Sequence, residues 1–386
     1  MAAGGDAIAR EPGGRVVFVE GAIVGELVRV ELTSSKRDFA KGVVVEVLEA
    51  SPDRVAPPCP HVARGCGGCG WQHIAPVRQL ELKRELVADA LRRQGGLPEA
   101  LVELGPPLPA HAFRTTARLG TDRAGTLGFR AAKSHRIVPI DDCMVLHPGI
   151  EALLGARVPG ADEVVLRIGA ATGERSARWD GPGRPEGFPD DVRLGDDAIV
   201  HERVGPVEFR VSARSFFQSS PEAAEALGAA VIDVLGDEVL AAADHVVDAY
   251  GGVGLFSATV VPHSTPVTLV ELSASSCADA RVNLAGRPAS VVELGVEQWS
   301  PTPAGIVIAD PARAGLGREG ATVLAATGAE RFVLVSCDVA AAGRDVRLLS
   351  EAGYVHHRSV VLDPFPHTAH VEVVTLLTRG GSGRPS

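Results

Sequence analysis

Short apolar, β-rich runs alternate with polar breaks at the start of the chain. The runs cover residues 16–19, 27–32 and 42–47, and turn-forming residues such as Gly21 separate them. This spacing predicts a small antiparallel barrel of the OB type. Such a barrel is either an accessory domain without a ligand or a platform for nucleic acid, and the pattern alone leaves both open.

A different pattern runs from residue 204 to residue 377, where apolar strands alternate with segments of helical period. A helix is predicted over 340–349. Strands are predicted at 246–249, 267–270, 306–309, 332–335 and 371–377. Strands and helices in alternation predict a doubly wound α/β domain.

Between these ends, the pair Pro57-Pro58 marks a boundary, and an amphipathic helix is predicted over 77–93. The strand-helix alternation that begins at 204 marks a second boundary. We therefore expect three domains: an N-terminal barrel over residues 1–56, a central domain over 57–203 and an α/β domain over 204–386.

Composition indicates where the protein resides. Hydrophobic residues make up 45% and mean hydropathy is +0.13, as in soluble globular proteins, and no apolar run approaches the length of a membrane span. Residues 1–14 lack the apolar core of a signal peptide, so we expect a cytoplasmic monomer without membrane contact. The net charge of −10 disfavours nucleic acid, but residues 61–150 carry 12 basic and 8 acidic side chains, a local net charge of +4.

Three cysteines cluster after the first boundary. Cys59, Cys66 and Cys69 form a C-x6-C-x2-C run with glycines between them, which lets the backbone wrap closely around a metal centre. Soft thiolates select zinc or iron–sulfur, and the sequence does not choose between the two. The fourth ligand has to come from elsewhere, and Cys143 is the best candidate. The alternative is a loop with free thiols.

Arginines alternate with apolar residues over 113–140, next to the cysteine cluster. Arg118 and Arg130 are two of them. The segment is either a solvated sheet face or a surface that contacts phosphates, and the neighbouring cysteines favour the phosphate-contacting surface.

A glycine-rich turn follows the predicted strand at 246–249, in the sequence Tyr-Gly-Gly-Val-Gly. Glu271 stands about 20 positions after Gly252, a distance suited to an acidic residue that binds ribose hydroxyls. The same pattern serves nicotinamide dinucleotides and S-adenosylmethionine. Because the turn is not G-x-G-x-x-G, it favours the methyl donor.

Cys337 ends the predicted strand at 332–335, just before a helix. Open α/β sheets bind ligands at such strand ends, and the helix N-terminus would favour a thiolate. The alternative is a small buried apolar side chain.

Taken together and in this order, the motifs resemble those of the bacterial RNA uracil-C5 methyltransferases, most closely the 23S ribosomal RNA branch. The resemblance covers about residues 14–377. It rests on the cysteine triplet, Phe216-Phe217-Gln218, the glycine turn, Asp310-Pro311-Ala312-Arg313, Ser336-Cys337-Asp338 and Asp363–Glu372. It implies an α/β class I (Rossmann-like) methyltransferase domain, a central β-rich domain with a [4Fe–4S] cluster and an N-terminal OB-type TRAM barrel.

The resemblance also implies a role for individual residues. Cys59, Cys66, Cys69 and Cys143 would hold the cluster. Gln218, Tyr250, Gly252, Glu271 and Asp310 would contact S-adenosylmethionine. Phe216 and Arg313 would face the target base, with Arg118 and Arg130 on the RNA. Cys337 would be the nucleophile and Glu372 the general base.

The implied reaction needs these residue types. Uracil C5 is a poor nucleophile until a soft thiolate adds to C6. After methyl transfer, a carboxylate has to remove the C5 proton so that the thiolate can leave. The base has to be unpaired or flipped out to be reached.

This chain departs from the family pattern at several positions. Leu255 replaces a usual Asn, Gly251 a usual Cys, and Ala312 a usual Pro. Asp338-Val339 replaces Asn-Pro, and an ionised Asp338 would raise the pKa of the neighbouring thiol.

Three alternatives to the 23S reading stay open. The chain could methylate transfer RNA, it could bind or assemble RNA without catalysis, or it could be a zinc-stabilised methyltransferase of a small molecule. Intact Cys337, Glu372 and Gln218 disfavour the second, and the TRAM-like barrel disfavours the third.

Overall fold

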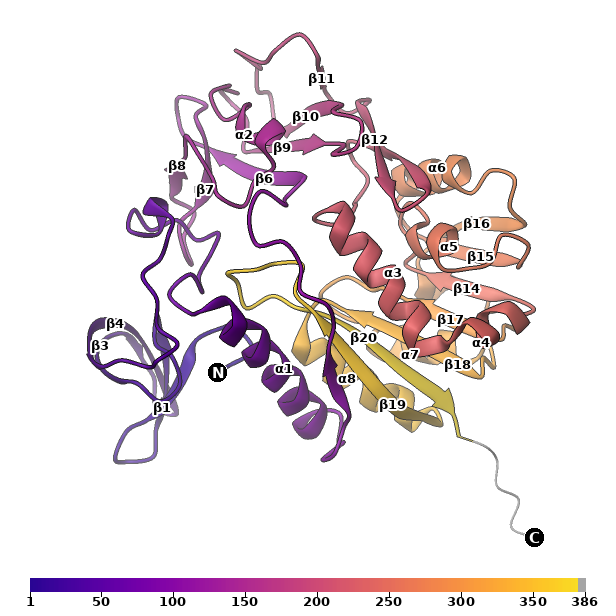
Figure 1. Ribbon diagram of the computed structural model, residues 1–386, viewed down its shortest axis with the longest axis horizontal. Helices are drawn as coiled ribbons and strands as arrows, with labels where there is room; N and C mark the ends of the chain where they lie inside the picture. The colour runs from indigo at the N-terminus through magenta and orange to yellow at the C-terminus, as the bar shows by residue number, and fades with distance from the viewer. Residues whose placement is uncertain (381–386) are drawn as a thin grey trace.

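The computed structural model describes residues 1–380, which form four sheets flanked by helices (Figure 1). The strands are β1 Ala7–Arg10, β2 Val16–Glu20, β3 Leu27–Ser35, β4 Phe39–Glu49, β5 Val102–Leu104, β6 Thr116–Thr121, β7 Leu127–Arg130, β8 Ile137–Pro139, β9 Glu163–Ile168, β10 Arg175–Asp180, β11 Val192–Leu194, β12 Ile199–Val204, β13 Val207–Ser212, β14 Val246–Ala249, β15 Val267–Glu271, β16 Ala289–Glu293, β17 Ile306–Ala309, β18 Arg331–Ser336, β19 Tyr354–Leu362 and β20 Glu372–Arg379. The helices are η1 Pro60–Val62, α1 Pro76–Arg93, α2 Pro148–Glu151, α3 Pro221–Leu235, α4 Asp237–Ala242, α5 Leu255–Thr259, α6 Ala274–Asn283, η2 Val296–Gln298, α7 Gly317–Ala325 and α8 Val339–Glu351.

The N-terminal sheet has the strand order β1-β2-β4-β3. The three runs predicted from the sequence are β2, β3 and β4, whereas β1 was not predicted. The small core of this N-terminal sheet contains Val17, Val19 and Ala40. The pairs β1–β2 and β3–β4 are antiparallel, as predicted, whereas β2 and β4 pair in parallel, so the prediction of antiparallel pairing is correct for two of the three strand pairs.

The central part contains a six-stranded sheet with the order β11-β10-β9-β6-β7-β8. The predicted basic strands over 113–140 are β6, β7 and β8. Apolar side chains of β6 and β7 pack with Leu146, Ile150 and Val164 into one core, and Cys143 is a buried member of that core.

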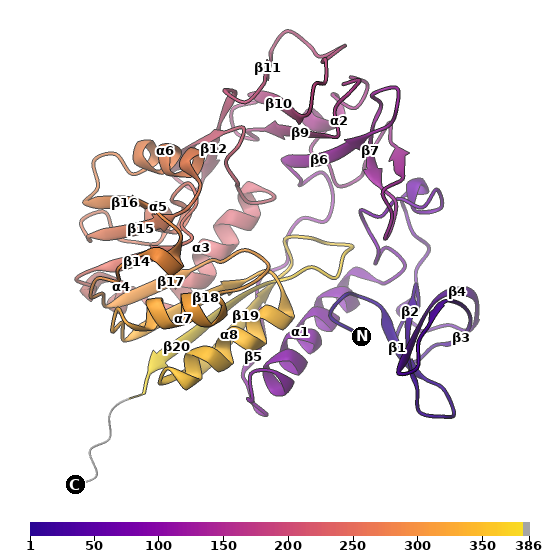
Figure 2. The same cartoon turned by 180° about the vertical axis from the view of Figure 1, so that it is seen from behind.

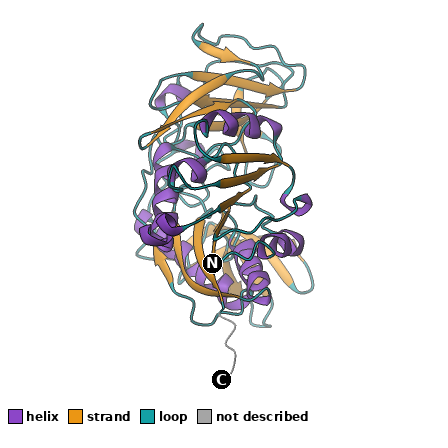
Figure 3. Cartoon of the chain, turned by 90° about the vertical axis from the view of Figure 1, so that its right-hand side faces the viewer, coloured by secondary structure: helices purple, strands orange, loops and turns teal. Residues whose placement is uncertain are grey.

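The C-terminal sheet has eight strands in the order β16-β15-β14-β17-β18-β20-β19-β5. β16, β15, β14, β17 and β18 are parallel, which confirms the predicted α/β fold, and β20 runs antiparallel to β18. Successive strand residues point to opposite faces. Val307 packs with α7 and α8 on one face, and Ile308 packs with α3 on the other. Figure 3 shows helices on both sides of the strands.

Two elements of the predicted central domain, α1 and β5, lie against or within the C-terminal sheet. Helix α1 packs on α8, and Leu82 and Leu91 of α1 share a core with Phe332 of β18. Strand β5 extends the sheet by pairing in parallel with β19. Both lie beside that sheet in Figures 1 and 2. The three-part division of the chain stays a proposal, and it has to assign these two elements to the C-terminal part.

Within residues 1–380, no helix combines the length and the apolar character that crossing a membrane requires.

Candidate active site and cysteine centre

A cavity of about 570 Å³ opens at the carboxyl ends of the parallel strands. This is the edge where open α/β sheets bind ligands. It brings together nine residues that the sequence predicts for the site: Phe216, Gln218, Tyr250, Gly252, Glu271, Asp310, Arg313, Cys337 and Glu372. Lining the same cavity does not by itself assign a chemical role to any of these nine residues.

The glycine-rich turn after β14 forms one wall of the cavity. Gly252 has φ +55 and Tyr250 has φ +59, a backbone conformation that is uncommon for a tyrosine. The Glu271 carboxylate at the end of β15 accepts hydrogen bonds from the N–H groups of Gly252 at 3.0 Å and Ser273 at 2.7 Å. The turn is therefore fixed to the neighbouring strand, and each carboxylate oxygen keeps a free lone pair.

Two departures from the family pattern have a packing explanation. A Cβ at position 251 would lie 2.5 Å from Leu269 Cγ and 3.1 Å from Asp248 Cγ, so Gly251 leaves no room for a cysteine in this packing. Leu255 is buried at the start of α5, where it packs with Val253 and Leu269 while also lining the cavity.

Three acidic groups, Cys337, Asp310 and Glu372, also line the cavity. Burial and then the charges of Glu372 and Asp310 raise the pKa of the Cys337 thiol to about 12, against an opposing effect of Arg313. Burial and the neighbouring Asp248 raise the pKa of Asp310 to about 7. Burial and then Asp310 raise the pKa of Glu372 well above its usual value. Burial and these neighbouring carboxyl groups therefore favour the protonated form of the Cys337 thiol.

Glu372 is the first residue of β20 and is 5% exposed. Within the described residues, its Oε2 atom has no hydrogen-bond partner. A buried polar atom without a partner costs free energy, and here it belongs to a side chain that lines the cavity. This carboxyl group is available to a ligand.

Asp338 has a local structural role beside the nucleophile candidate. Its carboxylate accepts a hydrogen bond from Ala341 N at 2.8 Å and caps the N-terminus of α8. The charges that mainly raise the pKa of Cys337 are those of Glu372 and Asp310. Asn and Asp cap helices about equally well, which explains why Asp fits at this position.

The four predicted cysteine ligands line a second cavity, of about 20 Å³. Burial, opposed by a hydrogen bond from Gln72, raises the pKa of Cys69 to about 11, and the thiols of Cys143 and Cys66 add to the shift. Cys143 thus lies beside the other three although it is far away in sequence. Arg114 lines the same cavity.

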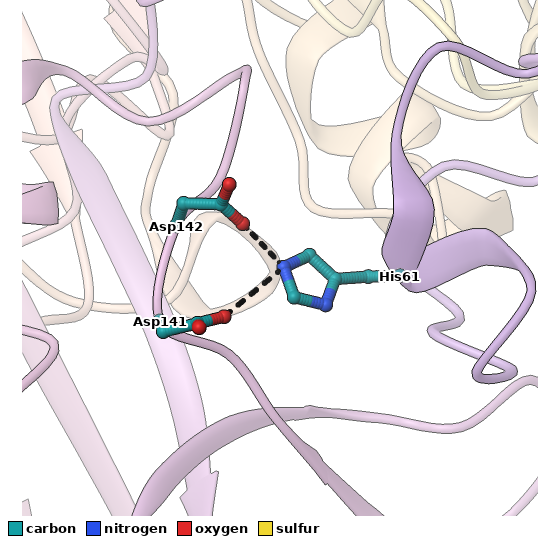
Figure 4. Close-up of side chains that lie close together, drawn as sticks. All are labelled: His61, Asp141 and Asp142. Carbon is teal, nitrogen blue, oxygen red and sulfur yellow. Dashed lines mark hydrogen bonds and ion pairs between the residues drawn. The ribbon is translucent and has the colours of Figure 1, made fainter.

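One trio of metal-ligand types lies close to this cavity. His61 is buried, and its Nε2 atom hydrogen-bonds to Asp142 and lies 3.7 Å from Asp141 Oδ1 (Figure 4). Within residues 1–380 it is the sole trio of His, Cys, Asp or Glu whose ligand atoms all lie within 4.8 Å of one another. The hydrogen bond ties the loop with Cys59 to the segment with Cys143.

Two predicted RNA contacts lie outside both cavities. Arg118 on β6 is mostly exposed and forms an ion pair with Glu163 on β9 at 2.5 Å. Arg130 is exposed at the end of β7, next to the cysteine loop, where its carbonyl oxygen accepts from Gly67 N. Neither arginine lines the large cavity, and contact of either one with an RNA backbone stays a prediction.

No role was predicted for Phe365 and His370, which line the large cavity. Their rings meet edge to face with centroids 6.0 Å apart. Both stand in the motif that precedes Glu372, so the motif located them without assigning a function.

The sequence of this chain is similar to those of known proteins. The family described as "TRAM domain" matches residues 3–45. An uncharacterized RNA methyltransferase of Streptomyces coelicolor is 34% identical over 99% of this chain and 92% of its own length. The 23S rRNA (uracil(1939)-C(5))-methyltransferase RlmD of Chromohalobacter salexigens is 32% identical, with 98% and 88% covered.

One solved structure shares the whole architecture. The Pyrococcus abyssi tRNA (uracil-54, C5)-methyltransferase, crystallised with S-adenosyl-L-homocysteine, superposes with a TM-score of 0.72. The match covers 97% of this chain and 100% of that one at 23% identity. At this level of identity the likeness shows a common fold.

Proposed function

We propose a reaction for this chain from the premise that it belongs to the S-adenosylmethionine-dependent RNA uracil-C5 methyltransferases: it methylates C5 of a uridine in RNA. The observation that carries the proposal is the joint placement of Cys337, Glu372 and the glycine-rich turn around one cavity. A thiol, a carboxyl group and a nucleoside-binding turn are the three parts that the chemistry requires.

Cys337 is the proposed nucleophile. Its thiolate adds to uracil C6, which moves the electron pair of the C5–C6 double bond onto C5 and O4. C5 is then nucleophilic enough to take the methyl group. Burial, Glu372 and Asp310 raise the pKa of the thiol, so we expect a positively charged methyl donor to favour the thiolate by opposing the two carboxyl charges.

Glu372 is the proposed general base. After methyl transfer, C5 carries both the methyl group and its original proton. The carboxylate takes that proton, the C5–C6 double bond re-forms and the Cys337 thiolate leaves. The Oε2 atom without a partner is suited to this step, because no protein group competes for it within the described residues.

Gln218, Tyr250, Gly252, Glu271 and Asp310 would hold the methyl donor. Bound S-adenosylmethionine supplies an electrophilic methyl group on a positively charged sulfur. The cavity fits such a ligand because it combines a fixed glycine turn with the Glu271 carboxylate, whose free lone pairs can accept hydrogen bonds from ribose hydroxyls.

Phe216 and Arg313 would receive the target base. Phe216 is 69% exposed although it is a large aromatic residue, so its ring is free to stack on an unpaired base. Arg313 is exposed and lines the cavity together with Cys337. Arg118 and Arg130 would contact phosphates farther along the RNA.

The four cysteines would hold a [4Fe–4S] cluster. A tetrahedral zinc site with sulfur at about 2.3 Å needs sulfur atoms about 3.8 Å apart. Within the described residues, no three cysteine sulfurs lie within even 4.8 Å of one another. That spread favours a larger centre, in which each cysteine binds a different iron atom. The cluster would stabilise the fold, since methyl transfer to an sp2 carbon needs no electron.

Metal analysis tests this centre. Protein purified without oxygen should be brown and contain about four iron and four sulfide per chain if the cluster is of the [4Fe–4S] type. Cys143→Ser should lose most of the iron. Stoichiometric zinc without iron would refute the cluster and support a zinc site.

The proposed RNA is 23S ribosomal RNA, as in the relative from Chromohalobacter salexigens. Nucleoside mass spectrometry of ribosomal and transfer RNA should show 5-methyluridine in 23S RNA that disappears on deletion of the gene. It should return with the wild-type chain and not with Cys337→Ala. Loss confined to transfer RNA would identify the other substrate, and no change in either RNA would refute the proposed reaction.

A further inference from the structure

The segment of residues 363–371 joins β19 to β20 and delivers Glu372 to the cavity. We propose that Lys83 and Gln79 on helix α1 are positioning residues for this segment and thereby for the general base. The inference rests on the function proposed above for Glu372. It concerns residues that lie outside the cavity and in a distant part of the sequence.

Lys83 is fully buried, with 0% of its surface exposed. Its Nζ atom donates to the Asp363 carboxylate and, at 3.1 Å, to the carbonyl oxygen of Phe365. Burial lowers the pKa of Lys83, and the Asp363 charge opposes that shift. The ammonium group therefore fixes two points at the start of the segment.

Stability alone does not account for this buried pair. Lysine is rarely buried unless it is paired, and replacing a buried ion pair with apolar residues is often neutral or stabilising. The core that α1 shares with α8 is apolar and includes Leu82, Leu86, Val87, Val346 and Leu349, so an apolar side chain at position 83 would have apolar neighbours on the same helix. What the pair supplies is a fixed geometry for the backbone of 363–365.

Gln79 lies one helical turn before Lys83 on the same face of α1. Its Oε1 atom accepts from His367 N at 2.8 Å, and its Nε2 atom donates to Ile74 O at 2.8 Å and Trp71 O at 3.1 Å. His367 O accepts in turn from Trp71 N at 2.8 Å. Both backbone polar groups of His367 are thus held from the N-terminal side of the chain.

His367 has φ +66, in the left-handed region that favours glycine. A non-glycine residue there is strained and persists only where its surroundings enforce it. The hydrogen bonds from Gln79 and Trp71 to the backbone of His367 hold it in this conformation. The strained residue lies between Phe365 and His370, which both line the cavity.

The expected effect is specific to one catalytic step. A general base has to reach its proton within hydrogen-bond distance, so a small displacement of Glu372 slows elimination. Cys337 directly follows β18, which pairs with β17 on one side and with β20 on the other. Because β17 holds β18 independently of the segment, we expect Cys337 to move less than Glu372 when the segment loosens. Loosening the segment should spare addition to C6 and slow release of the product.

Lys83→Met removes both hydrogen bonds and keeps the length of the side chain. Turnover should fall on the order of 100-fold, as for a displacement of about 1 Å at a catalytic group. A methylated protein–RNA adduct should accumulate on denaturing gels. Arg84→Met is the matched control, because Arg84 is the exposed neighbour on the same helix, and it should match wild type.

Lys83→Met also leaves Asp363 unpaired, which destabilises the fold. Lys83→Met/Asp363→Asn removes that charge and should recover the melting temperature while turnover stays low and the adduct persists. Recovery of turnover together with stability would refute the positioning role, as would a single variant with wild-type turnover. A wild-type chain that methylates no uridine would instead refute the proposed function.

Discussion

Replacing Glu372 with glutamine separates the two halves of the proposed reaction. The amide keeps the shape of the side chain and cannot take the C5 proton. Cys337 can still add to C6 and the methyl group can still arrive at C5. The thiolate then has no route to leave, so we expect a methylated protein–RNA adduct and a loss of turnover on the order of 100- to 10,000-fold.

The same substitution should stabilise the protein, because burial and Asp310 raise the pKa of Glu372 above its usual value near 4.5. The native state therefore holds this proton at pH values where the unfolded state has lost it. Stability from this group is complete below about pH 4.5 and is lost as the pH rises towards the native pKa. Glutamine carries no such proton, so its advantage should grow with pH, by at most about 1.4 kcal/mol per pH unit for one proton.

Two measurements decide between these expectations and their alternatives. Urea unfolding of both proteins between pH 4 and pH 8, without ligands, gives the difference in the free energy of unfolding. Denaturing electrophoresis with labelled RNA and S-adenosylmethionine gives the adduct. A glutamine variant that turns over like wild type would refute the role as base. A stability difference that shrinks with rising pH would refute the raised pKa.

Further predictions concern the nucleophile, the helix cap and the RNA surface. Cys337→Ala should abolish methylation and form no adduct, whereas 5-fluorouridine RNA should trap the wild-type protein, because fluorine cannot leave as a cation; an adduct at Cys277 would contradict this. Asp338→Ala should cost about 1 kcal/mol of unfolding free energy and Asp338→Asn only a few tenths, as for other N-caps, by urea unfolding. Asp338→Asn should leave the pH dependence of Cys337 alkylation unchanged. Arg118→Glu or Arg130→Glu should weaken RNA binding and its salt dependence in filter binding while S-adenosylmethionine binding is unchanged; equal loss of both would indicate misfolding.

Four of the five parallel strands of the C-terminal sheet could be predicted, because each is a short, mostly apolar run closed by a chemically distinctive residue, whereas β16 at Ala289–Glu293 was not predicted. Ile306–Ala309 ends at Asp310 and Arg331–Ser336 ends at Cys337. Strand β19 was not predicted, because His356, His357 and Arg358 interrupt its pattern around a bulge. Strand β5 has three residues, and its partner is far away in the sequence.

The members of the site could be predicted more fully than their surroundings. Nine predicted residues line one cavity, since strand ends in a parallel sheet meet at one edge. The pKa of Cys337 could not be predicted in the same way. The helix N-terminus suggested a favoured thiolate, but burial and two carboxyl groups that are distant in sequence outweigh it.

Lys83 shows why the residues that hold the segment before Glu372 could not be predicted from the sequence. A lysine among the charged residues of an amphipathic helix is normally solvated, and its burial depends on Asp363, 280 residues later in the chain. Because α1 also covers α8 and β5 completes the sheet edge, residues 204–386 alone lack part of their core. The segment before Glu372 would lose the contacts from Lys83 and Gln79 as well. We therefore expect the catalytic unit to include α1, and we expect a fragment cut at the predicted boundary of 203/204 to be less stable than the full chain.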